Sequence, residues 1–429
     1  MRHVPCQGGR VLSSEIKLGT LASLHNVRVN PKDFDEIVEH YSIPAWNSLE
    51  PELVQSSDIE SSKVLLPDEE HILVSCLNPS NHKIWRVGKN NSKVKRLAST
   101  EWAVVIPNNE EEIDFINSAL EGYHFQFQMN AYVTGTTNSH QRVKKPDFFH
   151  LTILFPEKNI RDKIGNLHSC LRRKLVTNKK ITEYCSSYIS YLYRSWFIDF
   201  DPVKAKAKGN SLYGMCENTA ALFPDTLEDS EIGPIPAGWA VSTIHDIAKQ
   251  RKETVRPDDF GDMTPYIGLE HMPRKSIALT EWGSSAGLDS NKFRFGKRDI
   301  LFGKLRPYFH KVGPAPLDGV CSTDILVIQP IDDDLRGFLL PILSSEHFVN
   351  FVSGISEGVG LPRTKWSHFK LYKIALPPAE IREKFASIVG PLLDKIESSI
   401  YGSKKMNCVR AELLPELMSD ELSVSQNSG

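Results

Sequence analysis

Two segments of the chain place apolar side chains alternately three and four residues apart. The first segment follows Pro156, and its apolar positions are Ile160, Ile164, Leu167, Leu171, Leu175, Ile181, Cys185, Ile189 and Leu192. The second segment follows Pro378, and its apolar positions are Ile381, Phe385, Ile388, Leu392, Ile396, Ile400, Val409, Leu413 and Leu417. This spacing is typical of a coiled-coil seam. Because neither helix can bury its stripe alone, the pattern predicts two long helices that pack against each other.

Both stripes contain interruptions that bear on this prediction. Asn178 lies in the single gap of the first stripe, where a buried asparagine would fix the register of the helices at a cost in stability. A solvated asparagine at the flank of the seam explains the gap equally well. Gly390-Pro391 and Gly402 interrupt the second stripe, and we expect Pro391 to kink the helix or to reset its start.

The whole chain also repeats itself at long period. Pro31-Lys32-Asp33-Phe34 returns as Pro257-Asp258-Asp259-Phe260, an offset of 226 residues (34 to 260). Further pairs follow in the same order at nearly the same offset: Leu21-Ala22 with Ile247-Ala248, Tyr41-Ser42 with Tyr266-Ile267, Ile72-Leu73-Val74 with Ile300-Leu301-Phe302, Leu77 and Pro79 with Leu305 and Pro307, Val87-Gly88 with Val312-Gly313, Ala98-Ser99-Thr100-Glu101 with Cys321-Ser322-Thr323-Asp324, and Phe155-Pro156 with Pro377-Pro378. Such colinear matches predict a duplication in which each copy is one α/β domain followed by one helix.

Composition narrows the class of protein. The chain has 429 residues, of which 40% are apolar and 24% charged, as in a globular protein of two or three domains. Residues 1–14 lack the apolar core of a signal peptide, and no stretch of about 18 apolar residues occurs. The seven cysteines are scattered without a Cys-x-x-Cys pair, which argues against a disulfide framework and a structural zinc. We therefore expect a cytoplasmic protein.

Charge is distributed unevenly along the chain. The formal net charge is only −2, so a surface for nucleic acid has to come from local clusters of cations. Lysine and arginine outnumber acids in residues 157–208, which we interpret mainly as a solvated helix face. Residues 209–236 are rich in Gly, Pro, Asn and acids and predict an exposed linker.

The motifs of the obvious enzyme classes are not evident. The nearest matches to an amine methyltransferase motif, Asp201-Pro202-Val203 and Pro377-Pro378-Ala379, lack the required residues, and no phosphate-binding glycine loop occurs. Glu15-Ile16-Lys17 has no room upstream for the acidic partner of a nuclease site. The histidines lack metal-ligand spacing, so we interpret His140, His168, His271 and His310 as surface or loop residues. These features favour a binding module with no catalytic and no metal-ligating residues.

Two loops in each half carry the candidate DNA contacts, because they mix cations, amides and aromatics directly after apolar strands. In the first half the candidates are Asn78, His82, Lys83 and Arg86 in one loop, and Thr136, Asn138, Ser139, His140, Gln141 and Arg142 in the other. In the second half they are Lys304, Arg306, Tyr308, His310 and Lys311 in one loop, and Arg363, Thr364 and Lys365 in the other. For each residue taken singly, a solvated loop side chain is the competing interpretation.

Several of these segments resemble the specificity subunits of Type I restriction-modification systems. The resemblance rests on Tyr193-Arg194-Ser195-Trp196-Phe197-Ile198-Asp199-Phe200-Asp201-Pro202-Val203-Lys204-Ala205-Lys206, Ile235-Pro236-Ala237-Gly238-Trp239, Phe302-Gly303-Lys304-Leu305-Arg306-Pro307-Tyr308 with Cys321-Ser322-Thr323-Asp324, and Leu413-Leu414-Pro415. It covers nearly the whole chain. The first half departs from the family pattern: it lacks a Gly-Trp start, and Phe155-Pro156 stands where a double proline is usual.

The resemblance implies a mixed α/β (α+β) fold with a pseudo-twofold internal repeat. We expect target recognition domains at 15–156 and 237–378, helices at 157–208 and 379–422 that pack as an antiparallel coiled coil, and a linker at 209–236. The implied function is non-catalytic recognition of a bipartite asymmetric site in double-stranded DNA. Two methyltransferase subunits and restriction subunits are the implied partners, and these would hold S-adenosylmethionine, ATP and Mg²⁺. A stand-alone DNA-modifying enzyme and an orphan scaffold or inhibitor that binds methyltransferase subunits remain as alternatives.

Overall fold

The computed structural model describes residues 14–47, 49–133, 141–210, 212–332, 334–358 and 360–418. The chain divides into two compact units, one formed by Met1–Val176 with Lys405–Gly429 and the other by Thr177–Lys404. We call them the first and the second unit and describe each by itself. Within the described ranges, none of the helices combines the length and the hydropathy that a bilayer span requires.

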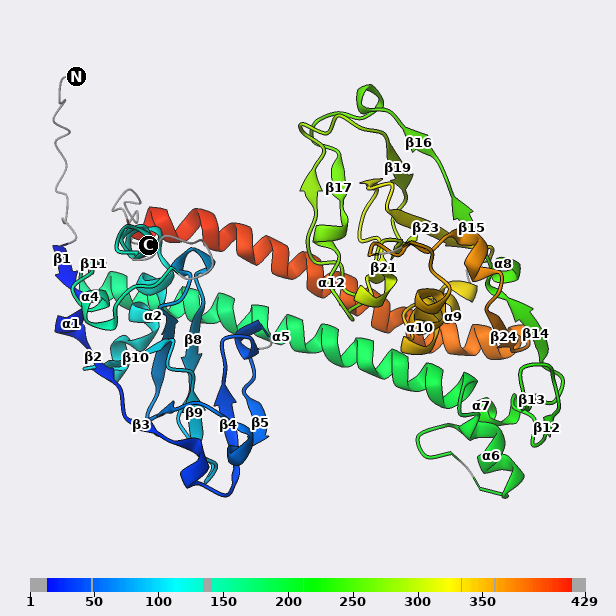
Figure 1. Cartoon of the computed structure of the whole chain (residues 1–429), viewed down its shortest axis with the longest axis horizontal. Coiled ribbons are helices and arrows are strands. Elements are labelled where there is room, and N and C mark those ends of the chain that lie inside the picture. The colour runs from blue at the N-terminus through cyan, green and yellow to red at the C-terminus, as the bar shows by residue number, and fades with distance from the viewer. Residues whose placement is uncertain are drawn as a thin grey trace, which may run out of the picture. The chain divides into compact units, whose positions relative to one another are not determined.

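The first unit is built on three sheets (Figure 1). A four-stranded sheet has the order β2 (Ala22–His25), β10 (Trp102–Pro107), β7 (His71–Ser75), β8 (Ile84–Val87). A five-stranded sheet has the order β3 (Arg28–Val29), β6 (Lys63–Leu65), β9 (Arg96–Ala98), β4 (Ile37–Tyr41), β5 (Glu52–Gln55). The third sheet pairs β1 (Ser14–Lys17) with β11 (Thr152–Phe155). The helices are α1 (Leu18–Leu21), α2 (Ile113–Glu121), α3 (Tyr123–Ala131), α4 (Lys145–Phe148) and parts of α5 (Lys158–Phe197) and α12 (Ala379–Met418).

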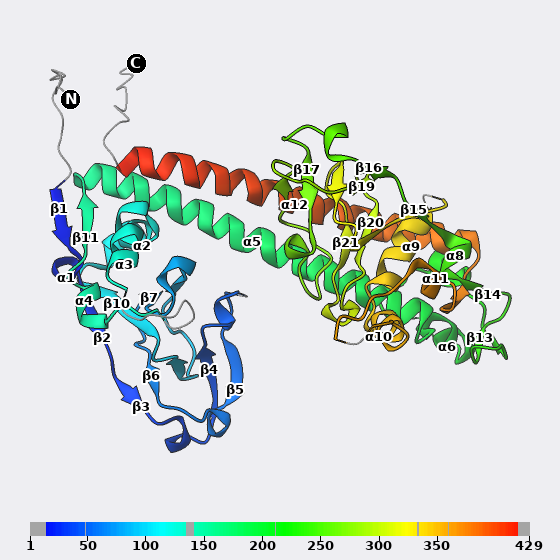
Figure 2. The ribbon, with the colours of Figure 1, turned by 45° about the horizontal axis from the view of Figure 1, so that its top comes forward.

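The second unit repeats this plan (Figure 2). Its four-stranded sheet has the order β15 (Ala248–Arg251), β23 (Ile325–Pro330), β20 (Ile300–Gly303), β21 (Val312–Pro314). Its five-stranded sheet has the order β16 (Thr254–Val255), β19 (Lys292–Phe295), β22 (Gly319–Cys321), β17 (Pro265–Ile267), β18 (Gly283–Ser284), and β14 (Ala240–Thr243) pairs with β24 (Lys373–Leu376). Its helices are α6 (Asp201–Ala207), α7 (Glu217–Ala221), α8 (Ile244–Ile247), α9 (Asp334–Leu343), α10 (Glu346–Gly354), α11 (Trp366–Phe369) and the remaining parts of α5 and α12.

The predicted duplication is therefore confirmed strand by strand, with one correction. Tyr41 and Tyr266 are not equivalent, because the parallel ladders pair Tyr41 with Ala98 but Ile267 with Cys321. The residue that corresponds to Tyr41 is thus Ile267, and the two tyrosines match only by chance. Equivalence extends to single hydrogen bonds: Lys63 Nζ donates to Ser61 Oγ and Lys292 Nζ to Ser290 Oγ, each at 2.6 Å.

The central strands separate two hydrophobic cores in each unit, because successive side chains of a strand point to opposite faces. In β7, Ile72 and Val74 join one core, whereas Leu73 joins the other. In β20, Ile300 and Phe302 join one core and Leu301 the other. The apolar runs of these strands reflect burial on both faces.

A helix packs against each long helix through a glycine contact. In the first unit, a Cβ added to Gly165 on α5 would lie 2.8 Å from the backbone nitrogen of Phe115 on α2. In the second unit, a Cβ added to Gly337 on α9 would lie 3.3 Å from the Cα of Ala386 on α12. The same crossing recurs in both copies, but the glycine belongs to the long helix in one and to the short helix in the other.

The two long helices run antiparallel in the second unit, as predicted. Trp196 of α5 packs on Phe385 near the start of α12, with ring centroids 5.5 Å apart. Asn178 lies 18 residues before Trp196 on α5 and is only 5% exposed. Its Nδ2 donates to the Ser399 carbonyl at 3.4 Å and to Ser403 Oγ at 3.2 Å. Asn178 is therefore a buried seam residue and not a solvated flank.

In the first unit the same two helices hold a buried charge cluster. Glu121 at the end of α2 accepts hydrogen bonds from Arg172 of α5, from Arg410 of α12 at 3.3 Å and from His168 at 3.1 Å. Burial opposes ionisation of Glu121, but these partners outweigh it and lower its pKa to about 2. The prediction that His168 is a surface or loop residue is wrong, since His168 lies on α5 and is fully buried. Its spacing from Ile164 already places it on the packed side of α5.

Two further predictions about the helices need correction. Pro391 does not reset the second helix, because α12 continues from Ala379 to Met418 through Gly390-Pro391. The first helix does not continue to residue 208: α5 ends at Phe197, and α6 begins at Asp201 after Phe200 in a left-handed backbone conformation (φ 53°). Pro202 favours this break because a proline suits only the first turn of a helix.

The linker is more ordered than its composition suggested. It contains α7 and the two-stranded ladder of β12 (Leu227–Glu228) with β13 (Ile235–Pro236). Phe223 is 1% exposed and packs against Trp196 with ring centroids 5.2 Å apart. Most described residues of the segment are exposed, as expected of a linker, but Phe223 and Ile235 are buried and anchor it.

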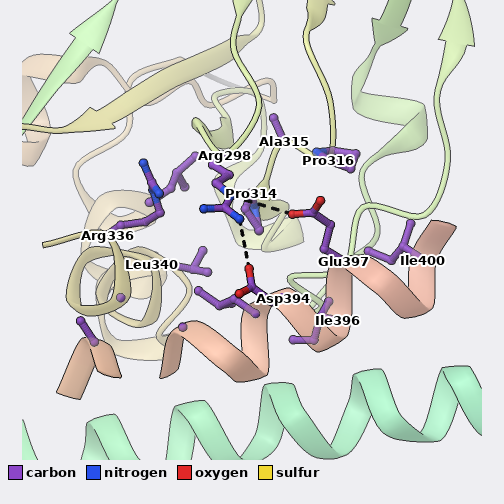
Figure 3. A pocket seen from close by; sticks show the side chains of 15 residues that line it. Arg298, Pro314, Ala315, Pro316, Arg336, Leu340, Asp394, Ile396, Glu397 and Ile400 are labelled. Carbon is purple, nitrogen blue, oxygen red and sulfur yellow. Dashed lines mark hydrogen bonds and ion pairs between the residues drawn. The ribbon is translucent and has the colours of Figure 1, made fainter. Parts of the chain in front are cut away.

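A cavity of about 170 Å³ lies in the second unit between α12, α9 and the loop that follows β21. Arg298, which lines the cavity, pairs with Asp394 at 3.1 Å and with Glu397 at 3.9 Å, both on α12. Figure 3 shows these side chains facing one another. Most of the lining side chains are apolar, among them Ile300, Leu340 and Ile396.

Candidate nucleic-acid interface

In each unit the two candidate loops meet at the end of a central strand. In the first unit, the backbone N–H of Asn78 donates to the Gln141 carbonyl at 2.8 Å, and that of Val143 donates to the Cys76 carbonyl at 3.0 Å. Leu77 and Arg142 form an antiparallel bridge between these bonds. The loop after β7 and the segment before α4 therefore form one surface.

The second unit joins its loops in the same register. The backbone N–H of Arg306 donates to the Pro362 carbonyl at 2.8 Å, and that of Thr364 donates to the Lys304 carbonyl at 3.0 Å. Leu305 and Arg363 form the bridge. We call this arrangement the loop junction of each unit, made of residues 76–78 with 141–143 and of residues 304–306 with 362–364.

The first loop of each junction holds a strained backbone. Asn78 and His82 in the first unit have φ values of 48° and 45°, and Arg306 and His310 in the second have 49° and 55°. They flank the 3₁₀ turns η4 (Pro79–Asn81) and η8 (Pro307–Phe309). Side chains other than glycine rarely adopt this left-handed region, and such strain concentrates at functional sites. The strain occurs at equivalent positions in both units, which supports a function for these loops.

Each junction also carries an ion pair between its second loop and the turn that leads into a central strand, β10 in the first unit and β23 in the second. Arg142 Nη2 lies 2.8 Å from Glu101, and Arg363 Nη2 lies 3.4 Å from Asp324. The arginine side chains are 56% and 59% exposed. Glu101 and Asp324 come from the Ser-Thr-Glu and Ser-Thr-Asp motifs that marked the repeat.

The cations of the second junction differ in their burial and in their contacts with other residues of the chain. Lys304 is half-buried, burial lowers its pKa, and its ammonium lies 5.3 Å from the Phe293 ring centroid. Arg306 stacks over Phe309 at 5.8 Å and lies 3.5 Å from the Gly360 carbonyl. Tyr308 is 50% exposed. Lys365 pairs with Glu357 at 2.5 Å at the rim of the junction.

Three predicted candidates of the second unit make contacts within the protein that stabilise the loops of the junction. His310 lies in the loop after η8, as expected, but it is only 8% exposed, and its Nε2 lies 2.8 Å from the Ser344 carbonyl. Thr364 is 1% exposed and contacts His368 Nδ1 at 3.3 Å. Lys311 donates to the Leu269 carbonyl. The sequence could not separate these residues from their exposed neighbours, because both groups are polar and adjacent.

In the first unit, too, some predicted candidates are held by contacts within the chain and others are exposed. Arg86 pairs with Glu70 at 2.8 Å and with Asp114, which fixes its guanidinium against α2 and away from the junction. His82 is exposed, and Lys83 lies 5.5 Å from the Trp46 ring centroid. Thr136, Asn138, Ser139 and His140 lie outside the described residues.

Comparisons with known proteins agree with this architecture. Residues 236–401 match the family model described as the Type I restriction modification DNA specificity domain. The chain is 24% identical over 282 residues to the MjaIX specificity subunit of Methanocaldococcus jannaschii, covering 64% of this chain and 61% of that protein. It is 21% identical over 398 residues to the HindI specificity subunit of Haemophilus influenzae, covering 82% of this chain and 86% of that protein. The chain is therefore similar in sequence to specificity subunits of Type I restriction enzymes, and its second unit carries the match to the family model.

A solved structure has the same fold as this chain. The S subunit of a Type I restriction-modification system from M. genitalium superposes with a TM-score of 0.59 and 14% sequence identity. The superposition covers 96% of this chain and 98% of that one. The likeness thus extends over both units, including the first, which lies outside the matched family model.

The fold of the first unit brings to the junction one residue that we did not single out from the sequence. Lys145, the first residue of α4, has a buried Nζ without a hydrogen-bond partner in the described part of the chain. Burial lowers its pKa, and Glu101 and Cys76 favour its charged form. The repeat contains a signal for this residue. Each junction has one half-buried lysine, but at different positions: Lys145 corresponds to Trp366 of the second unit, and Lys304 corresponds to Cys76 of the first.

Proposed function

We propose that this chain is the DNA sequence-recognition subunit of a Type I restriction-modification complex. Each unit reads one half of a bipartite asymmetric site in double-stranded DNA through its loop junction. The chain itself carries out no catalytic step, and methyl transfer and cleavage belong to partner subunits. It works in the cytoplasm, where DNA and these partners are present.

One observation carries this proposal. The two units present the same strained, hydrogen-bonded junction, yet the side chains on it differ: Asn78 corresponds to Arg306, and Cys76 to Lys304. Sequence is read by side chains at base edges, where asparagine suits adenine and arginine or lysine suits guanine. A shared scaffold with different side chains is therefore suited to reading two unlike half-sites.

A footprint of the assembled complex tests the proposal. The chain with its methyltransferase partners should protect two short tracts of DNA flanking an unprotected spacer, and the purified chain alone should neither methylate nor cut DNA. Methylation or cleavage by the chain alone would favour the stand-alone enzyme. An assembled complex without a sequence-specific footprint would favour the orphan scaffold.

We further propose that the long helices dock two methyltransferase subunits, which bind S-adenosylmethionine, and that restriction subunits using ATP and Mg²⁺ join this core. A tyrosine face on α5 supports the docking: Tyr184, Tyr188 and Tyr191 are 68%, 49% and 65% exposed. Their spacing of four and three residues places them on one side of the helix. Tyrosine is enriched at protein interfaces, so an unburied row of three is suited to a partner protein.

Replacing this tyrosine face tests the docking. Tyr184→Ser with Tyr188→Ser should weaken association with the methyltransferase subunit by about 10-fold or more, since buried aromatic anchors carry much of the binding energy. The matched control is Tyr308→Ser, which removes a half-exposed tyrosine from the second junction and should leave subunit association unchanged. Analytical ultracentrifugation or calorimetry measures the affinity. Equal affinities for the double variant and the wild type would reject the α5 face as the docking surface.

A further inference from the structure

The duplication allows phosphate-binding residues to be separated from base-reading residues. This inference rests on the proposed function. Unlike half-sites share no bases, but they share an identical sugar-phosphate backbone. Contacts to phosphates position a protein on DNA without reading sequence, whereas contacts to base edges read it. Residues that are the same in both junctions should therefore contact phosphates, and residues that differ should contact bases.

The arginine and acid pairs are the charged side chains that the two junctions share. Arg142 and Arg363 stand at equivalent positions, since each forms the bridge to the preceding loop, with Leu77 and Leu305 respectively. Each pairs with the acid of the equivalent turn. The turns are closed in the same way: the backbone N–H of Glu101 donates to Ser99 Oγ at 3.3 Å, and that of Asp324 donates to Ser322 Oγ at 3.2 Å.

The geometry of these pairs suits a phosphate ligand. Both guanidiniums are more than half exposed, whereas Glu101 and Asp324 are 27% and 32% exposed. The carboxylate holds a flexible side chain in one position before binding, which reduces the entropy lost on complex formation. Arginine presents five donors in a rigid fork that matches phosphate oxygens.

Further cations lie near each pair and raise the local positive potential. In the first unit, the positive charge of Arg28 adds to burial in lowering the pKa of Lys145. In the second unit, Lys252 and Arg363 exert the same effect on Lys304. These cations occupy different positions in the two units. Both junctions therefore have a positive potential, although different residues produce it.

We propose that Arg142 and Arg363 are equivalent phosphate anchors, one for each half-site, held in position by Glu101 and Asp324. The side chains that differ around them, Lys304 and Arg306 in the second unit and Asn78 in the first, read bases. The competing explanation is that each ion pair only closes the junction and does not touch DNA.

Salt dependence of binding distinguishes these explanations. The complex of the full chain with its methyltransferase partners is titrated with a duplex containing its site and with a duplex in which both half-sites are scrambled. Arg142→Gln and Arg363→Gln should each reduce the slope of log K against log salt concentration by about 0.9, and their combination by about 1.8. Each should weaken binding to both duplexes by the same factor. Lys158→Gln and Lys373→Gln, which break exposed pairs with Glu111 and Glu231, are the matched controls and should leave the slope unchanged.

A charge-retaining variant keeps the test decisive if a glutamine variant is poorly folded. Arg142→Lys should keep a slope near that of the wild type, because a lysine ammonium still binds phosphate. The proposal would be overturned if the slope were unchanged in the glutamine variants, or if Arg142→Lys reduced it as much as Arg142→Gln. Either result would mean that the ion pair only closes the junction. A change in base preference at one half-site would also overturn the proposal. A wild-type complex that binds both duplexes equally would refute the proposed function itself.

Discussion

At the scale of single residues, position 306 shows how one backbone conformation serves two reading surfaces. Arg306 and Asn78 share a left-handed conformation, with φ values of 49° and 48°, and the same backbone hydrogen bond to the second loop. The conformation therefore belongs to the scaffold, whereas the side chain is free to vary. Lys304 and Cys76, two residues earlier in each chain segment, likewise share a backbone position and differ in side chain.

Exchanging these side chains should change one half-site only. Arg306→Asn keeps a residue that tolerates the left-handed conformation, and Lys304→Met removes the ammonium. Each should cost about 1–3 kcal/mol of discrimination at the half-site read by the second unit, the range expected for a lost base contact. Competition binding with duplexes altered in one half at a time measures this. Equal losses at both half-sites would contradict the modular account.

Glu121 ties stability of the first unit to pH. Its carboxylate has a lowered pKa of about 2 in the folded chain, because His168, Arg172 and Arg410 outweigh the opposing effect of burial. A lowered pKa stabilises the fold above the unfolded value of about 4.3, and this contribution is lost as pH falls toward 2. Glu121→Gln should therefore destabilise the first unit by on the order of 3 kcal/mol near pH 7. Denaturant unfolding of wild type and variant should converge between pH 4.5 and pH 2, and a constant difference across that range would refute this role.

At the scale of elements, the crossing of α2 on α5 depends on the absence of a side chain. The added Cβ of Gly165→Ala would meet the Phe115 backbone nitrogen at 2.8 Å and the Asp114 backbone carbon at 3.1 Å. Backbone atoms of a packed helix move less easily than a flexible side chain, so α2 has to shift. The apolar stripe predicts the helix, but only the three-dimensional crossing explains the glycine.

Gly165→Ala should destabilise the first unit by about 1–3 kcal/mol, the usual cost of overpacking. Gly354→Ala is the matched control, because it makes the same change at the end of α10, where no atom lies within 4 Å of the new Cβ. It should be neutral or stabilising by up to about 1 kcal/mol through helix propensity. Thermal or denaturant unfolding provides the measurement. If both variants behave alike, close packing at Gly165 does not explain its presence.

At the scale of the whole molecule, the repeated order of apolar anchors was sufficient to predict two copies of one α/β plan with two antiparallel helices. Strand periodicity and seam spacing are set by backbone geometry, so they are visible in the sequence. The junction was predicted less completely. Lys145 lies far along the chain from Cys76, and their proximity depends on pairing between loops that no local pattern encodes. For the same reason the sequence did not show that His310 is buried or that Arg86 is held by Asp114.

The most direct measurement is a map of methylated adenines in DNA from cells that carry this chain with its partner subunits, compared with cells that lack only this chain. The account predicts a chain-dependent motif with two unlike specific halves separated by a nonspecific spacer of constant length. A single contiguous motif, or an identical methylation pattern without this chain, would contradict it.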